Sequence, residues 1–372
     1  MSQLAQEQNS INLGQGFPDF DPDETLVDNV TQAMKAGHNQ YPPMTGMPEL
    51  RHAIGDKVKN LYGHQYDATS EITVTSGASQ ALMASILAFV HPGDEVIVIE
   101  PVYDLYIPAI TLAGGHPVIV PMLAPAESDG RYRIDWGRVR DAITTKTRLL
   151  ILNFPHNPTC INLLEEDLDA LEDIVQKTGI TVLSDEVYEH IVFNGDSHRS
   201  VCSRRAIADN SVVISSFGKT FHVTGWKVGY CCAPAKLMKE IRKVHQFDVF
   251  TVVRPMQVAL ANYLQDPQKY LNLSSFYQKK HDRLYEGLKT TRLKPVRSEG
   301  TFFLLASYSE ISDMPELEFT RWLTMEKGVT AIPLSAFYQQ PDKAESNHGL
   351  IRFCFAKQDH TLNEAVSRLQ SL

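Results

Sequence analysis

The sequence predicts an α/β protein built on a mostly parallel β-sheet, together with a smaller α+β domain. Short runs rich in Val, Ile and Leu alternate with helical stretches through the middle of the 372-residue chain. Several of these runs are apolar at both odd and even positions, which is typical of strands covered by helices on both faces. Beyond about residue 270 the order changes to a long helix, short strands and further helices, which indicates a second structural unit.

Seven segments have the character of buried strands, and we expect them to form one sheet. They are residues 71–75, 95–99, 116–120, 148–152, 180–184, 211–215 and 227–232. The run ASQALMASILAFV (78–90) predicts a helix directly after the first strand.

The C-terminal part predicts helices and strands in a different order. We expect helices at 273–289, 317–328 and 361–372, and strands at 301–306, 329–333 and 350–356. Residues 42–268 are therefore predicted to form the large domain, and residues 1–41 with 269–372 the small domain.

Composition narrows the class of protein. A formal net charge of −9 and the lack of a block of basic residues argue against a nucleic-acid partner. No run of 18 apolar residues occurs, and the N-terminus has no signal-like core, so we expect a cytoplasmic protein without membrane partners. The histidines are scattered and no HExxH motif occurs, so no metal site is expected.

The five cysteines have neither CxxC pairing nor metal-like spacing. We expect all five to be reduced and mostly buried. The adjacent Cys231 and Cys232 should point to opposite faces of one strand. The cysteines are Cys160, Cys202, Cys231, Cys232 and Cys354.

Two glycine-containing segments resemble nucleotide-binding loops only superficially. A phosphate loop ending at Gly218, Lys219 and Thr220 would need a glycine at position 213, which is Val213. The segment GQGFPD (14–19) lacks the third glycine and the strand–helix context of a dinucleotide fingerprint.

Polar segments follow five of the predicted strands. They are SGAS (76–79), EPVYD (100–104), NFPHNP (153–158), DEVYE (185–189) and SFGK (216–219). Ligands of open α/β sheets collect at the carboxyl ends of the strands, so we expect these segments to form one site.

The residue types in these segments favour one cofactor. A desolvated lysine such as Lys219 can form a Schiff base with a carbonyl compound. Pyridoxal phosphate is such a compound and acts as an electron sink when a carboxylate, here Asp185, keeps its ring nitrogen protonated. The helix that opens after SGAS would direct backbone amides at the phosphate.

The chain resembles the fold-type I pyridoxal-phosphate aminotransferases of class I and II. Within them it is most similar to the branch of kynurenine/glutamine aminotransferases and bacterial methionine aminotransferases. The matching motifs occur in order over nearly the whole chain: INLGQGFPDF, NQYPPMTGMPELR, EPVYDLY, NFPHNP, SDEVYEH, SSFGKTFHVTGWKVGY, EGTFFLL and IRFCFAK.

The resemblance implies a role for each matching residue. Lys219 is similar to the lysine that binds the cofactor covalently and moves the proton, and Asp185 to the partner of the ring nitrogen. Asn157 and Tyr188 match the residues that bind the phenolic oxygen, and Tyr103 the ring that stacks on the cofactor. The implied phosphate-binding residues are Gly77, Ala78, Ser79, Ser216 and Lys227, with Tyr41 reaching the phosphate of a neighbouring subunit.

The resemblance also implies a substrate site at a homodimer interface. Arg352 matches the arginine that binds the substrate carboxylate, with Gly16 and Asn157 beside it. Phe17, and Phe250 near the neighbouring site, would line an apolar pocket, whereas Arg254 would favour acidic side chains if it pointed there. The chain begins close to its first motif, which leaves the contribution of an N-terminal arm to the dimer open.

Structural roles are the alternatives for the same residues. Asp185 could cap a helix, Asn157 could set a turn before Pro158, and Arg352 could form a structural ion pair. The tyrosines could simply pack in the core.

The predicted function is an aminotransferase with a two-stage cycle. An L-amino acid would give its amino group to the enzyme-bound cofactor, and a 2-oxo acid would receive it. Methionine is the favoured donor, followed by aromatic amino acids, kynurenine and glutamine. The alternatives are a pyridoxal-phosphate-dependent cysteine-S-conjugate β-lyase and a non-enzymatic cofactor-binding module.

Overall fold

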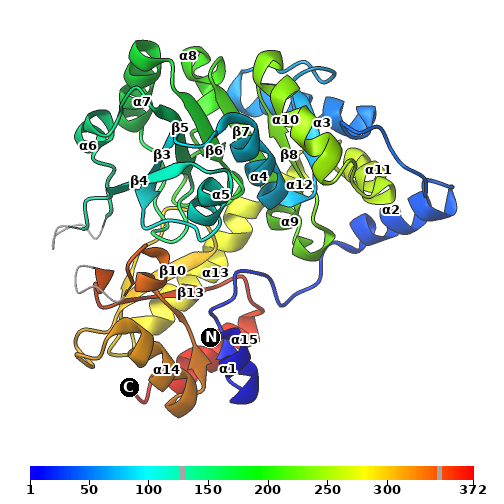
Figure 1. Ribbon diagram of the computed structural model, residues 1–372. Helices are drawn as coiled ribbons and strands as arrows, with labels where there is room; N and C mark the ends of the chain where they lie inside the picture. Colours follow the sequence, from blue (N-terminus) through cyan, green and yellow to red (C-terminus); the bar gives the residue numbers. More distant parts are fainter. Residues whose placement is uncertain (126–130, 342–345) are drawn as a thin grey trace.

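The computed structural model describes residues 1–125, 131–341 and 346–372 (Figure 1). Its main feature is a seven-stranded sheet in the order β2-β8-β7-β6-β5-β3-β4. The strands are β2 (Ile72–Thr75), β3 (Glu95–Glu100), β4 (His116–Pro121), β5 (Thr147–Asn153), β6 (Thr181–Asp185), β7 (Ser211–Ser216) and β8 (Gly229–Cys232). All seven lie at the predicted segments to within a few residues.

The sheet is parallel except for one strand. β8 pairs antiparallel with both β2 and β7, whereas the remaining neighbours are parallel. The prediction of a mostly parallel sheet is therefore confirmed. Because the parallel strands share one direction, their carboxyl ends lie at one edge of the sheet.

Helices cover both faces of this sheet (Figure 1). One face packs against α4 (Gly77–Phe89), α5 (Tyr106–Leu112) and α10 (Ala235–Asp248), and the other against α3 (Pro48–Tyr62) and α7 (Glu165–Thr178). Val96 and Val98 point to the first face, and Ile97 and Ile99 to the second, which explains why β3 is apolar at both parities.

The remaining helices of this part are short or lie at its rim. They are α6 (Trp136–Asp141), α8 (Arg205–Ala208), α9 (Phe217–Thr220), α11 (Arg254–Tyr263) and α12 (Gln268–Leu271). The second helix of the chain, α2 (Glu24–Lys35), packs against α11.

A smaller unit lies below the large sheet in Figure 1. Its antiparallel sheet has the order β12-β13-β10-β9, and β1 pairs with β11 beside it. The strands are β1 (Ile11–Asn12), β9 (Lys294–Val296), β10 (Phe303–Ser307), β11 (Val329–Thr330), β12 (Ile332–Pro333) and β13 (Leu350–Cys354), and the helices are α1 (Ser2–Glu7), α13 (Leu273–Leu288), α14 (Glu316–Glu326) and α15 (Asp359–Leu369). The predicted α+β unit is confirmed, while its exact boundaries, 1–41 and 269–372, stay a prediction.

The cysteine predictions agree with the structure. All five thiols are free and buried. Cys231 packs with the core on one face of the sheet and Cys232 with the core on the other. Cys160 has a φ of 64°, in the left-handed region where glycine is favoured.

No helix in the described ranges is long and apolar enough to span a bilayer. Over the same residues, no three His, Cys, Asp or Glu side chains gather in a way that could hold a metal ion.

Candidate active site

A cavity of about 440 Å³ opens where the carboxyl ends of the parallel strands meet the smaller unit. This volume is within the range of small-molecule sites. Twelve of the predicted site residues line it: Gly16, Gly77, Ala78, Ser79, Tyr103, Asn157, Asp185, Tyr188, Ser216, Lys219, Lys227 and Arg352. These residues come from segments up to 336 positions apart, so only the fold brings them together.

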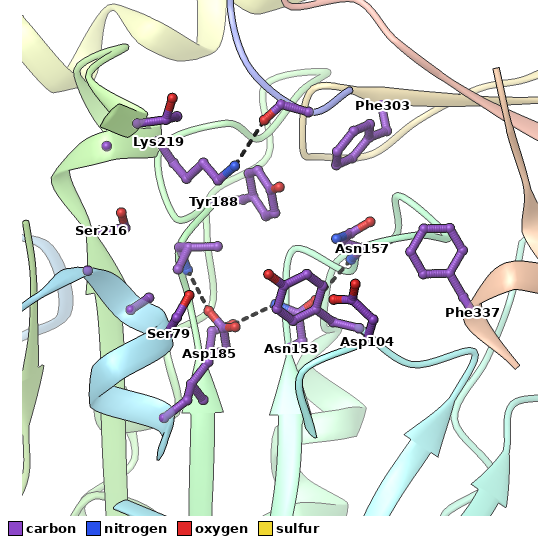
Figure 2. Close-up of a pocket in the computed structure, with 18 of the residues that line it drawn as sticks. Ser79, Asp104, Asn153, Asn157, Asp185, Tyr188, Ser216, Lys219, Phe303 and Phe337 are labelled. Carbon is purple, nitrogen blue, oxygen red and sulfur yellow. Dashed lines mark hydrogen bonds between the residues drawn. The ribbon is translucent and has the colours of Figure 1, made fainter. Parts of the chain in front are cut away.

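Lys219 lies on α9, the single helical turn that follows β7. Its amine donates a hydrogen bond of 3.0 Å to the backbone carbonyl of Gly16, shown as the upper dashed line in Figure 2. Burial lowers the pKa of Lys219 to about 8, since a charged amine is poorly solvated there. A fraction of this amine is thus neutral, and nucleophilic, near neutral pH.

Asp185 is the last residue of β6 and lies at the floor of the cavity (Figure 2). Tyr106 donates a hydrogen bond of 2.7 Å to its Oδ2, and the Val187 amide donates one of 3.3 Å to its Oδ1. Burial raises the pKa of Asp185 to about 6, although the Tyr106 hydrogen bond works in the opposite direction. A cation close to Asp185 would stabilise the charged carboxylate and lower its pKa again.

The N-terminus of α4 and Lys227 form one end of the cavity. Gly77 has a φ of +72°, and a β-carbon built on it would lie 3.3 Å from the Lys227 amine. The N-cap residue of α4, Ser76, makes no side-chain capping bond, so its side chain does not occupy the amides of the first turn. Together with Ser79 and Ser216, these groups suit a phosphate, which prefers helix N-termini and a fixed cation.

Arg352 lies on β13 at the opposite side of the cavity. It is 6% exposed, donates from Nη1 to Asn157 Oδ1, and packs between the rings of Phe303 and Phe337. Its Nε is buried without a hydrogen-bond partner in the described part of the chain. Burial lowers the pKa of Arg352. A buried guanidinium with a free donor is suited to bind a carboxylate, because a carboxylate neutralises the positive charge and accepts two parallel hydrogen bonds from the planar group.

The cavity between the α4 end and Arg352 is lined by Tyr188, Tyr103 and Asn157. Burial raises the pKa of Tyr188 well above its usual value, so its hydroxyl remains a donor. The backbone amide of Asn157 donates to Asn153 Oδ1, and Asn153 in turn donates to the Asp185 carbonyl. The turn that carries Asn157 is therefore tied to the strand that carries Asp185.

Four of the predicted residues, Tyr41, Phe17, Phe250 and Arg254, do not line the cavity in the single chain. Tyr41 is 80% exposed and packs edge-on against the ring of Phe250, 5.7 Å away. Phe17 is 42% exposed and directed at the Lys357 amine. Arg254, at the start of α11, is also outside the cavity, and its Nε has no partner among the described residues. Their proposed roles in the pocket or at a subunit interface stay predictions.

Other lining residues were not singled out from the sequence. Asn153 and Asp104 belong to the polar segments at the strand ends, so a signal for them existed. Phe303, Ile332 and Phe337 form an apolar wall and carry no motif of their own. Tyr106, which donates a hydrogen bond to Asp185, was also not predicted as a site residue.

The residues present fit pyridoxal phosphate. The cavity combines a phosphate-like end, a carboxylate on its floor, a lysine with a lowered pKa, and a buried guanidinium with a free donor. Among the described residues no ion pair neutralises Lys219, Asp185 or Arg352, and Arg352 Nε has no hydrogen-bond partner, so a purely structural role accounts for these groups less well.

Comparisons with known proteins agree with this chemistry. The family described as aminotransferase class I and II matches residues 8–369. A methionine aminotransferase of Escherichia coli is 48% identical over 373 residues, covering 100% of this chain and 94% of that protein. A kynurenine–oxoglutarate transaminase of Dictyostelium discoideum is 36% identical over 403 residues, covering 100% and 92%.

A solved structure is similar throughout. The crystal structure of an Escherichia coli protein, whose reactivity identified a methionine aminotransferase function, superposes with a TM-score of 0.95 at 48% identity. The match covers 100% of this chain and 96% of that one.

Proposed function

The chain belongs to the class I and II aminotransferases, and from this membership we propose that it binds pyridoxal 5′-phosphate in the cavity and prefers methionine as amino donor. The family uses this cofactor to move amino groups between amino acids and 2-oxo acids. The observation that carries the proposal is the placement of the Lys219 amine and the free donor of Arg352 on one cavity.

Pyridoxal phosphate, when bound, supplies an electron sink that makes the α-C–H bond of an attached amino acid acidic. Lys227, Ser79, Ser216 and the first amides of α4 would hold its phosphate. Asp185 would hold the proton on its ring nitrogen, and Asn157 with Tyr188 would donate to its phenolic oxygen. Tyr103 would stack on its ring.

The chain's own groups then direct the substrate. Arg352 would bind the α-carboxylate through two parallel hydrogen bonds, which turns the α-hydrogen toward Lys219. Lys219 Nζ, which is neutral above about pH 8, would take the proton from the α-carbon and return it at the cofactor's C4′. The reverse steps would convert a 2-oxo acid into its amino acid.

Preference for methionine is supported by the apolar wall and by the similar proteins. Phe303, Ile332 and Phe337 would surround a thioether or aromatic side chain. Aromatic amino acids, kynurenine and glutamine are further candidate donors. No observation favours a β-lyase or a non-enzymatic module.

We also propose a homodimer with a site at the subunit interface. Its support is the contact between the exposed rings of Tyr41 and Phe250, with the exposed Phe247 three residues before Phe250, since exposed aromatic groups mark interaction surfaces. In that arrangement Tyr41 would reach the phosphate of the partner site. A monomer by analytical ultracentrifugation would refute this part of the proposal.

Absorption and activity test the proposed function. The purified protein with added cofactor should show the visible band of the lysine-bound form, and Lys219→Ala should lose it. The holoenzyme should then convert methionine and a 2-oxo acid into the corresponding oxo acid and amino acid. A band that survives Lys219→Ala, or release of ammonia and pyruvate from a cysteine conjugate without amino transfer, would refute it.

A further inference from the structure

The loop of residues 14–19 is bound by two lysines, the half-buried Lys219 and the buried Lys357. On its cavity side, the Gly16 carbonyl accepts a hydrogen bond from Lys219. One residue later, the Phe17 carbonyl accepts a hydrogen bond of 2.8 Å from Lys357 Nζ, which also lies 3.5 Å from the Gln15 carbonyl. Successive carbonyls of this loop are thus bound by two different amines.

Lys357 is an unusual lysine. It is 4% exposed, yet no carboxylate lies within ion-pair distance of its amine in the described residues. Its charge is balanced by the two loop carbonyls and by the Phe17 ring, 5.0 Å from the amine. An apolar side chain could fill this volume without the desolvation of an ammonium group, so packing alone does not account for the amine.

The backbone of Lys357 is itself held by a hydrogen bond from another lysine. Lys280, on α13, donates a hydrogen bond of 2.7 Å to the Lys357 carbonyl and pairs with Asp359 at 3.1 Å. Lys357 therefore has little freedom to follow the loop if the loop shifts, and its amine is a rigid anchor.

A second set of bonds ties the end of the loop to the same segment. Asp19 accepts hydrogen bonds from the Gln358 amide and from the Thr361 hydroxyl, and its carbonyl accepts one from the Gln358 side chain. These residues follow β13, the strand that carries Arg352. The loop and Arg352 are thus parts of one rigid arrangement.

Small shifts of this loop would change the shape of the cavity. Gly16 packs so closely on Phe303 that a β-carbon on it would lie 2.7 Å from the Phe303 ring. Phe303 in turn packs on the guanidinium of Arg352. A displacement near 1 Å in such a contact can lower a catalytic rate about 100-fold.

We propose that Lys357 is a positioning residue: its amine fixes residues 15–17 so that the Gly16 carbonyl faces Lys219 and the substrate wall stays aligned with Arg352. Its effect on catalysis rests on the proposed function, while its effect on the loop does not.

The variant Lys357→Met tests the proposal, because methionine keeps the length and packing but cannot donate. In the holoenzyme we expect kcat/KM for the amino donor to fall by about 10- to 100-fold, mainly through KM, with the visible spectrum of the bound cofactor unchanged. Lys357→Arg, which keeps donors and charge, should recover part of the loss.

Lys327→Met is the matched control. Like Lys357, Lys327 does not line the cavity, but its amine donates to the Ser371 carbonyl at 2.8 Å and not to the loop of residues 14–19. The variant Lys327→Met should leave both kcat and KM within about twofold of the wild type, because it removes the same type of hydrogen bond at a place that does not contact the loop.

Hydrogen exchange of the cofactor-free protein is the second measurement. Peptides that contain residues 14–19 should exchange faster in Lys357→Met than in the wild type and in Lys327→Met, and peptides from β5 and β6 should be unchanged. If Lys357→Met does not fold, Asp19→Ala, at an exposed position, should accelerate the same exchange.

Two outcomes would overturn the proposal. One is loop exchange at the wild-type rate in Lys357→Met, and the other is faster exchange with unaltered kcat/KM. A wild-type protein without transaminase activity would instead refute the proposed function, and the exchange rates would still decide whether Lys357 anchors the loop.

Discussion

Tyr106 donates a 2.7 Å hydrogen bond to Asp185 on the floor of the cavity. Burial raises the pKa of Asp185 to about 6. The hydrogen bond from Tyr106 lowers this pKa, because it stabilises the charged carboxylate. A charged Asp185 is what a protonated ring nitrogen requires, so Tyr106 supports the proposed cofactor site although it does not line the cavity.

Tyr106→Phe should therefore raise the pKa of Asp185 further in the cofactor-free protein. The ring and its packing remain, so the change isolates the hydrogen bond, worth about 1.5–3 kcal/mol to a charged acceptor. Carboxyl carbon NMR of the apo protein over pH 4–9 would measure it, with Asp185→Asn assigning the signal. An unchanged pKa would contradict the role given to Tyr106. Cofactor affinity should fall in parallel.

Lys219 should become reactive at lower pH than a surface lysine. Its folded pKa of about 8 lies below the ordinary 10.5, so the neutral amine appears as the pH rises through 8. Labelling of the apo protein with an amine-directed reagent, followed by peptide mapping, should give a midpoint near pH 8 for Lys219. Lys289, whose pKa is raised by its pairing with Glu286, is the internal comparison. Equal midpoints at both lysines would count against the desolvated amine.

Arg352→Lys should weaken substrate binding without abolishing the fold. The substitution keeps the charge but loses the planar fork that pairs with a carboxylate. We expect affinity of the holoenzyme for 3-phenylpropionate, a carboxylate without an amino group, to fall about 100-fold, or roughly 3 kcal/mol. Titration of the cofactor's visible spectrum would report it. Arg321→Lys, at an exposed position on α14, should bind like the wild type. Equal affinity in Arg352→Lys would place the carboxylate elsewhere.

Glu189→Gln should destabilise the protein strongly. Glu189, the residue after Tyr188, forms a buried ion pair of 2.6 Å with Lys57, and its carboxylate also accepts a hydrogen bond from Tyr62. Burial alone would raise the pKa of Glu189, but the Lys57 charge holds it well below its usual range. Removing one charge leaves the other buried and unpaired, which costs about 3–5 kcal/mol.

Urea unfolding of the apo protein would measure this cost. The control is Glu286→Gln, which breaks the exposed pair with Lys289 and should change the free energy of unfolding by less than about 1 kcal/mol. Similar effects of the two substitutions would contradict the importance of the buried pair.

Much of the fold could be predicted from the sequence, because strands that are buried on both faces of a sheet appear as continuous runs of apolar residues. The four central residues of β3, Val96 to Ile99, are all apolar and buried, and a requirement of this kind is visible without any knowledge of the neighbouring strands. The antiparallel direction of β8 left no such mark. Its apolar residues suit either direction, and only the pairing with β2 and β7 distinguishes them.

The polar residues of the site were also readable, because parallel strands place their carboxyl ends together. Lys219, Asp185 and Asn157 each follow a predicted strand, and the structure places all three on one cavity. Phe303 and Phe337 were not, since an aromatic residue in a core and one in a cavity wall have the same sequence context.

The sequence by itself thus determined the sheet, the strand-end residues and the family they indicate. Only the tertiary structure decided which groups support them. Tyr106 meets Asp185 across 79 positions, and Lys357 meets Phe17 across 340. Such contacts depend on how helices and loops pack after the strands have assembled, and side-chain hydrogen bonds between distant segments impose no periodic pattern on the chain.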